Sequence, residues 1–453
     1  MSPAKFYHLS LENLTILKPR AKIMIKSMGI DEFNAKFLEA VKRRGESQFE
    51  ELKATVQGIL DTVKRDGDPA LLAYGEQFDN IKLTQAQLLV SPKEFSDAYA
   101  QLDLDTLDAL KQMKNNIATF HEAQKRELWY VETRKGVSVG QLMRPLERVG
   151  LYVPGGKALY PSTVIMTAVP AKIAGVKEVI LCTPPLPDGS INPLVLVAAK
   201  EAGVDAIYKV GGVQAIGAMT YGTETISPVN KIVGPGNKYV NAAKLIVSTT
   251  VGIDLPAGPS EVLIIADETA NPEFIAIDLI SQAEHDENAY CFLVTPSRSL
   301  IEQVQAAMKR LISKQVRRAI IEKALKDNGY LILSEELSQA IDLCNEIAPE
   351  HLEIQTQNDE MVLSRINNAG AIFMGKYSPV PVGDYAAGSN HVLPTGGSAK
   401  IYSGLSLFSF MKLIDVVKCS KVGIQTLAPW IQILAGFEGL DAHLHSIQMR
   451  LDL

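Results

Sequence analysis

The sequence predicts an α/β protein made of two parallel-sheet units with helices on both faces, plus small helical segments at the N- and C-termini. Two series of short apolar runs alternate with helical segments, the first from residue 148 and the second from residue 261. This alternation indicates parallel strands joined by crossover helices. The chain of 453 residues is also too long for one small core. We therefore expect two Rossmann-like units.

The N-terminal third shows helical periodicity and little visible chemistry. Residues 1–49 are mixed and charged, which indicates an N-terminal arm or short helices. Their basic cluster, Lys42–Arg44, is interpreted as a solvent-exposed face rather than a binding patch. Apolar residues recur at helical spacing over 48–65 and 93–125, and the turn Asp66–Pro69 leads into a further helix.

The strands of the two series are bounded by turn residues. The first series comprises residues 148–153, 178–182, 206–210 and 231–233, with helices beginning near Ser162, Asn192, Gly212 and Asn237. The second comprises residues 261–265, 291–294, 330–333, 351–354 and 370–373. After Gly397 the sequence becomes helical. No clear sequence repeat relates the two series.

We divide the chain into four parts on this basis. The predicted parts are an N-terminal arm (1–49), a first α/β domain with the metal and catalytic residues (50–150 and 260–400), a second α/β domain with the nucleotide-binding turns (151–259), and a C-terminal helical segment (401–453).

Composition excludes several classes of protein. A net charge of −6 argues against a general nucleic-acid or anionic-membrane binder. No stretch is apolar enough to span a bilayer, and the N-terminus has no secretory signal pattern. The cysteines (182, 291, 344 and 419) form no Cys-x-x-Cys pair and are interpreted as structural thiols. A reducing, cytoplasmic location fits.

Three Gly-rich turns follow strands of the first series. They are Tyr152–Gly156, Val210–Gln214 and Gly234–Asn237, and each leads into a helix. Ligands of open α/β sheets bind at the carboxyl ends of strands, and a helix N-terminus favours an anion such as pyrophosphate. None of the turns is Gly-x-Gly-x-x-Gly or a Walker loop. Tight turns without any ligand would explain each one singly, but the cluster suggests a nucleotide.

Candidate metal ligands and bases come later in the chain. Gln282 and His285 close a predicted helix at a spacing that puts both side chains on one face, where they could hold Zn²⁺. Glu350–His351 at a strand entrance offers two proton acceptors, provided that Pro349 turns the backbone.

A loop and the C-terminal segment hold further candidates. The loop 381–397 is rich in small residues and includes Asp384 and His391. Asp384 could instead cap a turn, and His391 could be a hydrogen-bonded structural histidine. On spacing alone, His443 and His445 are more typical of surface histidines than of ligands.

Eight separate motifs resemble those of the histidinol dehydrogenase family, from about residue 50 to the C-terminus. They are Asp66–Leu71, Leu151–Gly156, Gly234–Asn237, Pro256–Glu261, Ser281–Asp286, Ala348–His351, Gly383–Thr395 and Asp441–His443. The resemblance implies two successive NAD-dependent oxidations, of L-histidinol to L-histidinal and then to L-histidine, in a homodimer whose C-terminal segment reaches the partner's site.

The resemblance also implies roles for individual residues. Zn²⁺ would be held by Gln282, His285, Asp384 and His443; Glu350 and His351 would be the acid/base pair; substrate contacts would include Ser260, His351 and Glu438; NAD contacts would include Tyr152, Gln214 and Asn237. His351 would take the hydroxyl proton, and Glu350 would activate water for the second oxidation. The alternatives are a related zinc/NAD dehydrogenase acting on another small polar alcohol, a zinc hydrolase, and a non-catalytic small-molecule-binding protein.

Overall fold

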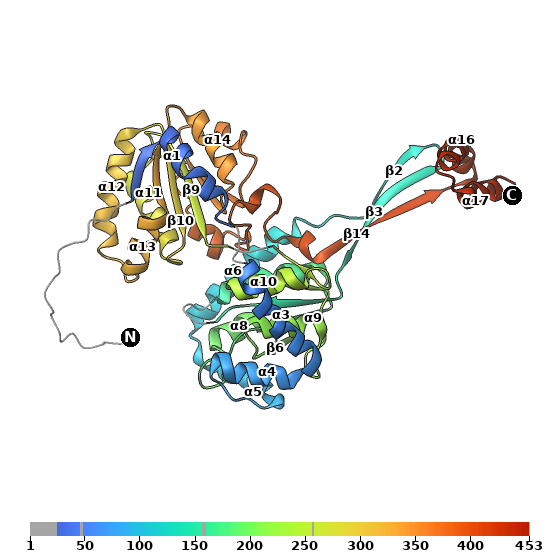
Figure 1. Ribbon diagram of the computed structural model, residues 1–453, viewed down its shortest axis with the longest axis horizontal. Helices are drawn as coiled ribbons and strands as arrows, with labels where there is room; N and C mark the ends of the chain where they lie inside the picture. The colour runs from blue at the N-terminus through green and yellow to red at the C-terminus, as the bar shows by residue number, and fades with distance from the viewer. Residues whose placement is uncertain (1–24, 46–48, 156–159, 256–257, 453) are drawn as a thin grey trace.

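The computed structural model describes residues 25–45, 49–155, 160–255 and 258–452. Two α/β units lie side by side, and an extended arm projects away from them (Figure 1). Gly156, Pro256 and Ala257, which belong to two of the predicted motifs, and the first 24 residues of the predicted N-terminal arm lie outside the described residues.

The first unit is built on a parallel sheet, here called the large sheet, with strand order β1-β11-β10-β9-β12-β13. Alternate residues of β9 enter cores on opposite faces, so helices cover both sides. Its strands are β1 (Lys26–Gly29), β9 (Glu261–Ala266), β10 (Tyr290–Thr295), β11 (Gly329–Leu333), β12 (His351–Gln355) and β13 (Ala371–Met374). Its helices are α1 (Ile30–Lys36), α2 (Leu38–Lys42), α11 (Pro272–Ala283), α12 (Arg298–Ile312), α13 (Arg318–Asn328), α14 (Leu337–Ile347) and α15 (Asp359–Leu363).

The second unit is built on the small sheet, which is also parallel and has the order β6-β5-β4-β7-β8. Its strands are β4 (Arg148–Tyr152), β5 (Glu178–Cys182), β6 (Ala206–Tyr208), β7 (Lys231–Val233) and β8 (Gly252–Ile253). One face packs against α5 (Pro92–Gln101), α6 (Leu104–Glu122), α7 (Pro161–Ala174) and α8 (Pro193–Ala202). The other packs against α3 (Phe49–Asp66), α4 (Asp68–Tyr74), α9 (Gly212–Tyr221) and α10 (Lys238–Val247).

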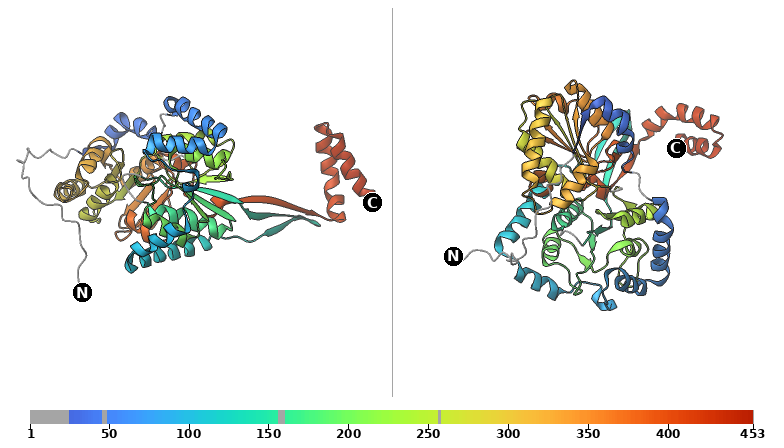
Figure 2. Two further views of the ribbon diagram at one scale, coloured as in Figure 1. Left: turned by 90° about the horizontal axis from the view of Figure 1, so that it is seen from below. Right: turned by 60° about the vertical axis from the view of Figure 1, so that its left-hand side comes forward.

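The arm is an antiparallel sheet of order β14-β3-β2 that carries two helices at its far end (Figures 1 and 2). Its elements are β2 (Trp129–Arg134), β3 (Val137–Pro145), β14 (Met411–Cys419), α16 (Lys421–Phe437) and α17 (Asp441–Leu451). Short turns of 3-10 or π-helix occur at Gly75–Asp79, Gln85–Gln87, Val382–Ala386, Ser398–Lys400 and Leu407–Phe410.

The two predicted series of parallel strands are confirmed, but the structure departs from the predicted division of the chain. Residues 26–44 form β1, α1 and α2 of the large-sheet unit, rather than a separate arm. The helices between residues 49 and 122 pack on the small sheet, not on the large one. Residues 411–419 form β14 rather than a helix, because they pair with β3, more than 260 residues earlier in the chain. Local periodicity cannot show which sheet covers an amphipathic helix, or that a strand has a distant partner.

Candidate active site

The candidate acid/base pair lies at the amino end of β12, beside the amino end of the neighbouring strand β9 of the large sheet. His351 is the first residue of β12 and pairs in register with Val262 of β9. The helix α14 ends at Ile347, and Ala348 then adopts a left-handed conformation with φ of 50°. This turn brings the two side chains together, with His351 Nδ1 3.5 Å from Glu350 Oε2. The expected turn before the strand is present.

Both members of the pair are buried, and their protonation is set by that burial. Burial lowers the pKa of His351 to about 4, so the imidazole is neutral near pH 7. Its Nδ1 lies 2.9 Å from the carbonyl oxygen of Glu261. Because a carbonyl only accepts, Nδ1 carries the hydrogen and Nε2 keeps its lone pair. Burial raises the pKa of Glu350 well above its ordinary value, although the Glu261 N–H donates to its Oε2 at 2.9 Å.

Asp384 faces this pair from a short π-helix (Val382–Ala386). Its Oδ1 lies 3.8 Å from His351 Nε2, and burial raises the pKa of its carboxyl to about 7. His391, seven residues later, has Nδ1 3.2 Å from the Asp384 carbonyl oxygen and Nε2 3.1 Å from the Thr163 hydroxyl. His391 is therefore a hydrogen-bonded structural histidine that ties the Asp384 loop to α7 of the second unit.

The two remaining ligand candidates from this region end α11 and begin the following turn. Gln282 is buried, and neither its amide oxygen nor its nitrogen has a hydrogen-bond partner within the described ranges. His285 follows in the turn, with its N–H donating to the Gln282 carbonyl oxygen at 3.3 Å. His285 is exposed as a residue, yet desolvation by the surrounding protein lowers the pKa of its imidazole, and a charge on His285 would lower the pKa of His351 further.

His285 lines a cleft of about 430 Å³ between the two units. The first unit contributes Glu284, His285, Arg317 and Tyr385 to its walls; α6, Tyr160 and the start of α7 form the opposite wall. A cleft between two α/β units is a common place for a small-molecule site.

The predicted nucleotide contacts lie at the carboxyl ends of strands of the small sheet. The Tyr152 hydroxyl accepts a hydrogen bond from the Gly212 N–H at 3.0 Å. Gln214 is buried, and its amide oxygen is unpaired among the residues described. Asn237 caps α10, its Oδ1 accepting from the N–H groups of Tyr239 and Val240. The structure thus gives Asn237 a capping role of its own.

Three further predicted residues lie apart from this cluster. Ser260 is half-buried and directly precedes β9, so it lies next to Glu261 at the same sheet edge. Glu438 and His443 are exposed on α16–α17, at the far end of the arm (Figure 1). Within the described part of one chain, no group of three or more His, Cys, Asp or Glu is arranged to hold a metal ion. The four predicted ligands are therefore not assembled by a single subunit.

Comparison with known proteins identifies the family. A family model described as histidinol dehydrogenase matches residues 42–451. The chain belongs to the histidinol dehydrogenase family. It is 50% identical to a histidinol dehydrogenase of Methanosarcina mazei over 397 residues, which cover 87% of this chain and 91% of that protein. It is 45% identical to one from Lactococcus lactis, over 95% of this chain and all of the relative.

A solved structure supports the same assignment. The crystal structure of histidinol dehydrogenase from Elizabethkingia anophelis superposes with a TM-score of 0.90 at 41% identity, covering 94% of this chain and 98% of that one. The family match shows an NAD-dependent oxidoreductase. None of the described helices combines the length and hydropathy needed to cross a membrane.

For this histidinol dehydrogenase family member, sequence reasoning missed two residues at the site. The sequence predicts that Arg44 belongs to a solvent-exposed cluster, but its side chain is fully buried against Glu261. Glu261 lies in one of the family motifs, but the sequence alone does not indicate its role. In the sequence, a charged residue just after a short helix resembles a surface residue, and only its buried partner Glu261 distinguishes it.

Proposed function

We propose that the protein oxidises L-histidinol through L-histidinal to L-histidine with two NAD⁺, the last step of histidine biosynthesis. The observation that carries the proposal is the buried Glu350–His351 pair with Asp384 3.8 Å from His351 Nε2, in a chain of this family. A lone pair on a neutral, buried imidazole suits removal of a hydroxyl proton.

A zinc ion fits the donors that the structure leaves unsatisfied. Gln282 has both amide atoms buried without partners in the described chain, and such atoms are costly unless a ligand pairs them. Burial raises the pKa of Asp384, and a cation bound nearby would lower this pKa again. We infer that Gln282, His285 and Asp384 hold Zn²⁺ together with His443 of the partner subunit, a donor set that zinc accepts. Zn²⁺, when bound, orients the substrate through its amino and imidazole nitrogens.

The chain's own residues then divide the acid/base work. His351 accepts the hydroxyl proton at Nε2 in the first oxidation, because its Nδ1 is occupied by the Glu261 carbonyl. Glu350 activates water for the second oxidation. Ser260 and Glu438 of the partner subunit contact the substrate, and Glu438 suits its cationic groups. We expect Glu350→Gln to slow L-histidinal oxidation more than L-histidinol oxidation, and equal losses would contradict this division of roles.

NAD⁺ is assigned to the carboxyl edge of the small sheet, with contacts from Tyr152, Gln214 and Asn237. The unpaired amide oxygen of Gln214 and the turn closed by the Tyr152 hydroxyl support this assignment. NAD⁺, when bound, accepts the hydride. The unpaired thiols among the described residues fit a cytoplasmic location, which we also propose.

The arm supports a homodimer with shared active sites. It leaves large apolar side chains exposed along β2, β14 and α16, which is unfavourable in an isolated subunit. The exposed residues include Trp129, Val131, Leu413, Val417, Trp430, Leu434 and Phe437. A second copy related by twofold symmetry could cover them and receive Glu438 and His443 at its own site.

The test of the activity is the NADH yield from L-histidinol. We expect two NADH for each substrate, loss of turnover with a chelator, and recovery with added Zn²⁺. One NADH per substrate, or turnover without NAD⁺, would reject the proposal. An equal rate with unrelated small alcohols would favour the broader dehydrogenase instead.

The test of site sharing is a mixed dimer of His351→Asn and His443→Asn subunits, purified through two different tags. A shared site predicts one intact site in two, so about half of the wild-type activity should return. Sites confined to one subunit predict no recovery. His445→Asn, which changes another exposed histidine of α17, is the control and should keep full activity.

A further inference from the structure

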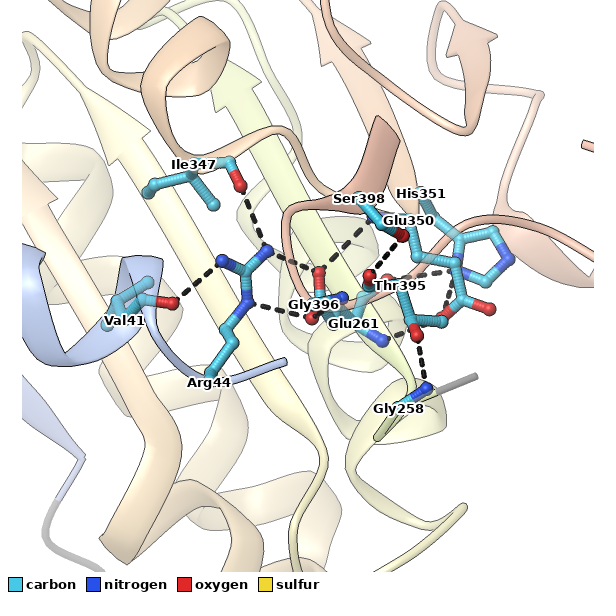
Figure 3. Close-up of polar contacts among 10 residues, drawn as sticks. All are labelled: Val41, Arg44, Gly258, Glu261, Ile347, Glu350, His351, Thr395, Gly396 and Ser398. Atoms are coloured by element: carbon cyan, nitrogen blue, oxygen red, sulfur yellow. Dashed lines mark hydrogen bonds and ion pairs between the residues drawn. The ribbon is translucent and has the colours of Figure 1, made fainter. Parts of the chain in front are cut away.

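The Arg44 side chain is buried, and each of its three guanidinium nitrogens donates a hydrogen bond. Nε and Nη2 donate to the two carboxylate oxygens of Glu261 at 2.7 and 2.6 Å (Figure 3). Nη1 donates to the Val41 carbonyl oxygen at 2.8 Å, and Nη2 also donates to that of Ile347 at 3.0 Å. Arg44 thus joins the end of α2 to the start of β9 and the end of α14. A bidentate pair of this kind fixes orientation as well as charge.

Glu261 in turn contacts both proposed bases. Its backbone N–H donates to Glu350 Oε2 at 2.9 Å, and its carbonyl oxygen accepts from His351 Nδ1 at 2.9 Å. Its carboxylate accepts from the backbone N–H groups of Gly396 at 2.7 Å and of Glu350 at 3.4 Å. Figure 3 shows Glu261 between the guanidinium and the acid/base pair. Any displacement of Glu261 would therefore move both bases.

The charges around Glu350 make Arg44 more than a packing contact. The groups that face Glu350 are Glu261 from β9, Asp384 from the π-helix, His351 from β12 and Arg44 from the end of α2. Arg44 is the permanent cation of this group. Two buried carboxyl groups in contact cannot both ionise unless a cation lies beside them.

We infer that Arg44 is a positioning residue for the Glu350–His351 pair: its bidentate contact fixes Glu261, and the backbone N–H and carbonyl groups of Glu261 orient the two bases. Arg44 acts through Glu261 and touches neither base by any hydrogen bond recorded for it. The inference rests on the proposed function, because it assumes that Glu350 and His351 perform the two oxidations.

A double-mutant cycle tests this inference. The variants are Arg44→Gln, Glu261→Gln and the two combined, each assayed separately with L-histidinol and L-histidinal across pH. Arg44→Gln leaves a buried anion beside Glu350, so we expect the acid limb of L-histidinal oxidation to move upward by about one pH unit, a tenfold loss below the limb. Glu261→Gln leaves an unmatched cation and should move the limb downward. The neutral double variant should return close to the wild-type limb.

Two further variants serve as rescue and control. Arg44→Lys keeps the positive charge but loses the bidentate geometry of the guanidinium. It should therefore bring the acid limb of L-histidinal oxidation closer to its wild-type pH than it brings the reaction rate to its wild-type value. Arg318→Gln removes a surface arginine that pairs with Glu322 and should change neither. KM for NAD⁺ should be unchanged throughout, since the nucleotide turns lie on the other sheet.

If the role of Arg44 is purely structural, the expected result differs. Arg44→Gln would then lower thermal stability and slow both oxidations equally, and the acid limb of L-histidinal oxidation would not move; that result would overturn the inference. If Arg44→Gln does not fold, the opposite shift in Glu261→Gln and its reversal in the double variant decide. A wild-type protein that forms no NADH from L-histidinol would instead reject the proposed function.

Discussion

The two α/β units share an architecture but use opposite edges of their sheets. In the small-sheet unit, Tyr152, Gly211 and Gly234 lie at the carboxyl ends of strands, where backbone turns meet helix N-termini. In the large-sheet unit, Glu261 and His351 are the first residues of strands, so its polar cluster lies at the amino edge. A nucleotide is bound largely by backbone turns, whereas proton transfer needs buried titratable side chains.

The two units also treat buried charge differently. In the small-sheet unit the buried Lys244 ammonium pairs with the Asp254 carboxylate and donates to the Gly234 carbonyl oxygen at 3.0 Å. In the large-sheet unit Asp278 and Glu353, both buried, share the Gln355 amide as a donor at 3.3 and 3.0 Å. In the first case opposite charges compensate each other, whereas in the second two buried carboxyls lie close together and their pKa values are raised.

The largest effect should come from the base on the large sheet. We expect His351→Asn to lower the rate of L-histidinol oxidation by about 10²–10⁴-fold, because a positioned general base contributes about that much. NAD⁺ affinity, measured by fluorescence titration, should stay unchanged because the nucleotide is assigned to the other unit. A large loss of NAD⁺ affinity in this variant would break the proposed separation of roles.

Two buried glutamines, Gln282 in the large-sheet unit and Gln214 in the small-sheet unit, give a sharper contrast. Loss of a group that only supports a metal ligand typically costs about 10–100-fold in metal affinity, so Gln282→Ala should weaken Zn²⁺ binding by at least that factor. Gln214→Ala should weaken NAD⁺ binding by about fivefold, the loss of roughly 1 kcal/mol of hydrogen bonding. Each variant serves as the other's control, with metal content and NAD⁺ titration as the measurements. Loss of NAD⁺ binding in Gln282→Ala, or loss of Zn²⁺ in Gln214→Ala, would contradict these two assignments.

The turn after β7 should be sensitive to any side chain. Gly234 has φ of +120°, and an added Cβ would lie 2.1 Å from the Tyr152 carbonyl oxygen. Gly234→Ala should therefore lower the free energy of unfolding by about 1–3 kcal/mol and raise KM for NAD⁺. Gly58, in α3, has no atom within 4 Å of the position of an added Cβ. Gly58→Ala should raise the free energy of unfolding by about 0.5–1 kcal/mol. Urea titration of both variants measures these changes.

The last effect is a pH dependence of stability, and it concerns the carboxyl pair of the large-sheet unit. Burial raises the pKa of Asp278 to about 6, and burial beside Asp278 raises the pKa of Glu353 well above its ordinary value. The folded protein holds these protons where the unfolded chain, with a pKa of about 4, has released them. This contribution to stability is therefore full below about pH 4 and is lost as pH rises through about 6.

Urea midpoints measured between pH 4 and 7 test this pH dependence. Asp278→Asn should flatten the decline in stability over that window. An unchanged slope would show that the pair does not titrate there.

Much of the fold could be predicted because parallel strands are short, apolar and bounded by turns. The starts of β9, β12 and α10 follow from local patterns around Glu261, His351 and Asn237. The candidate site was found by motif, and the structure places His351, Glu350 and Asp384 together. The four predicted zinc ligands do not come together within one chain, because His443 lies on α17 of the arm, far from the two sheets.

By itself, the sequence determined the two series of strands, the Gly-rich turns, the family and the residues with chemical potential. The tertiary structure alone decided that Arg44 is buried, that the helices between residues 49 and 122 cover the small sheet, and that Met411–Cys419 pairs with β3. The reason is physical. Periodicity and turn chemistry are encoded within a few residues, whereas the partner of a charge, a helix face or a strand can lie hundreds of residues away.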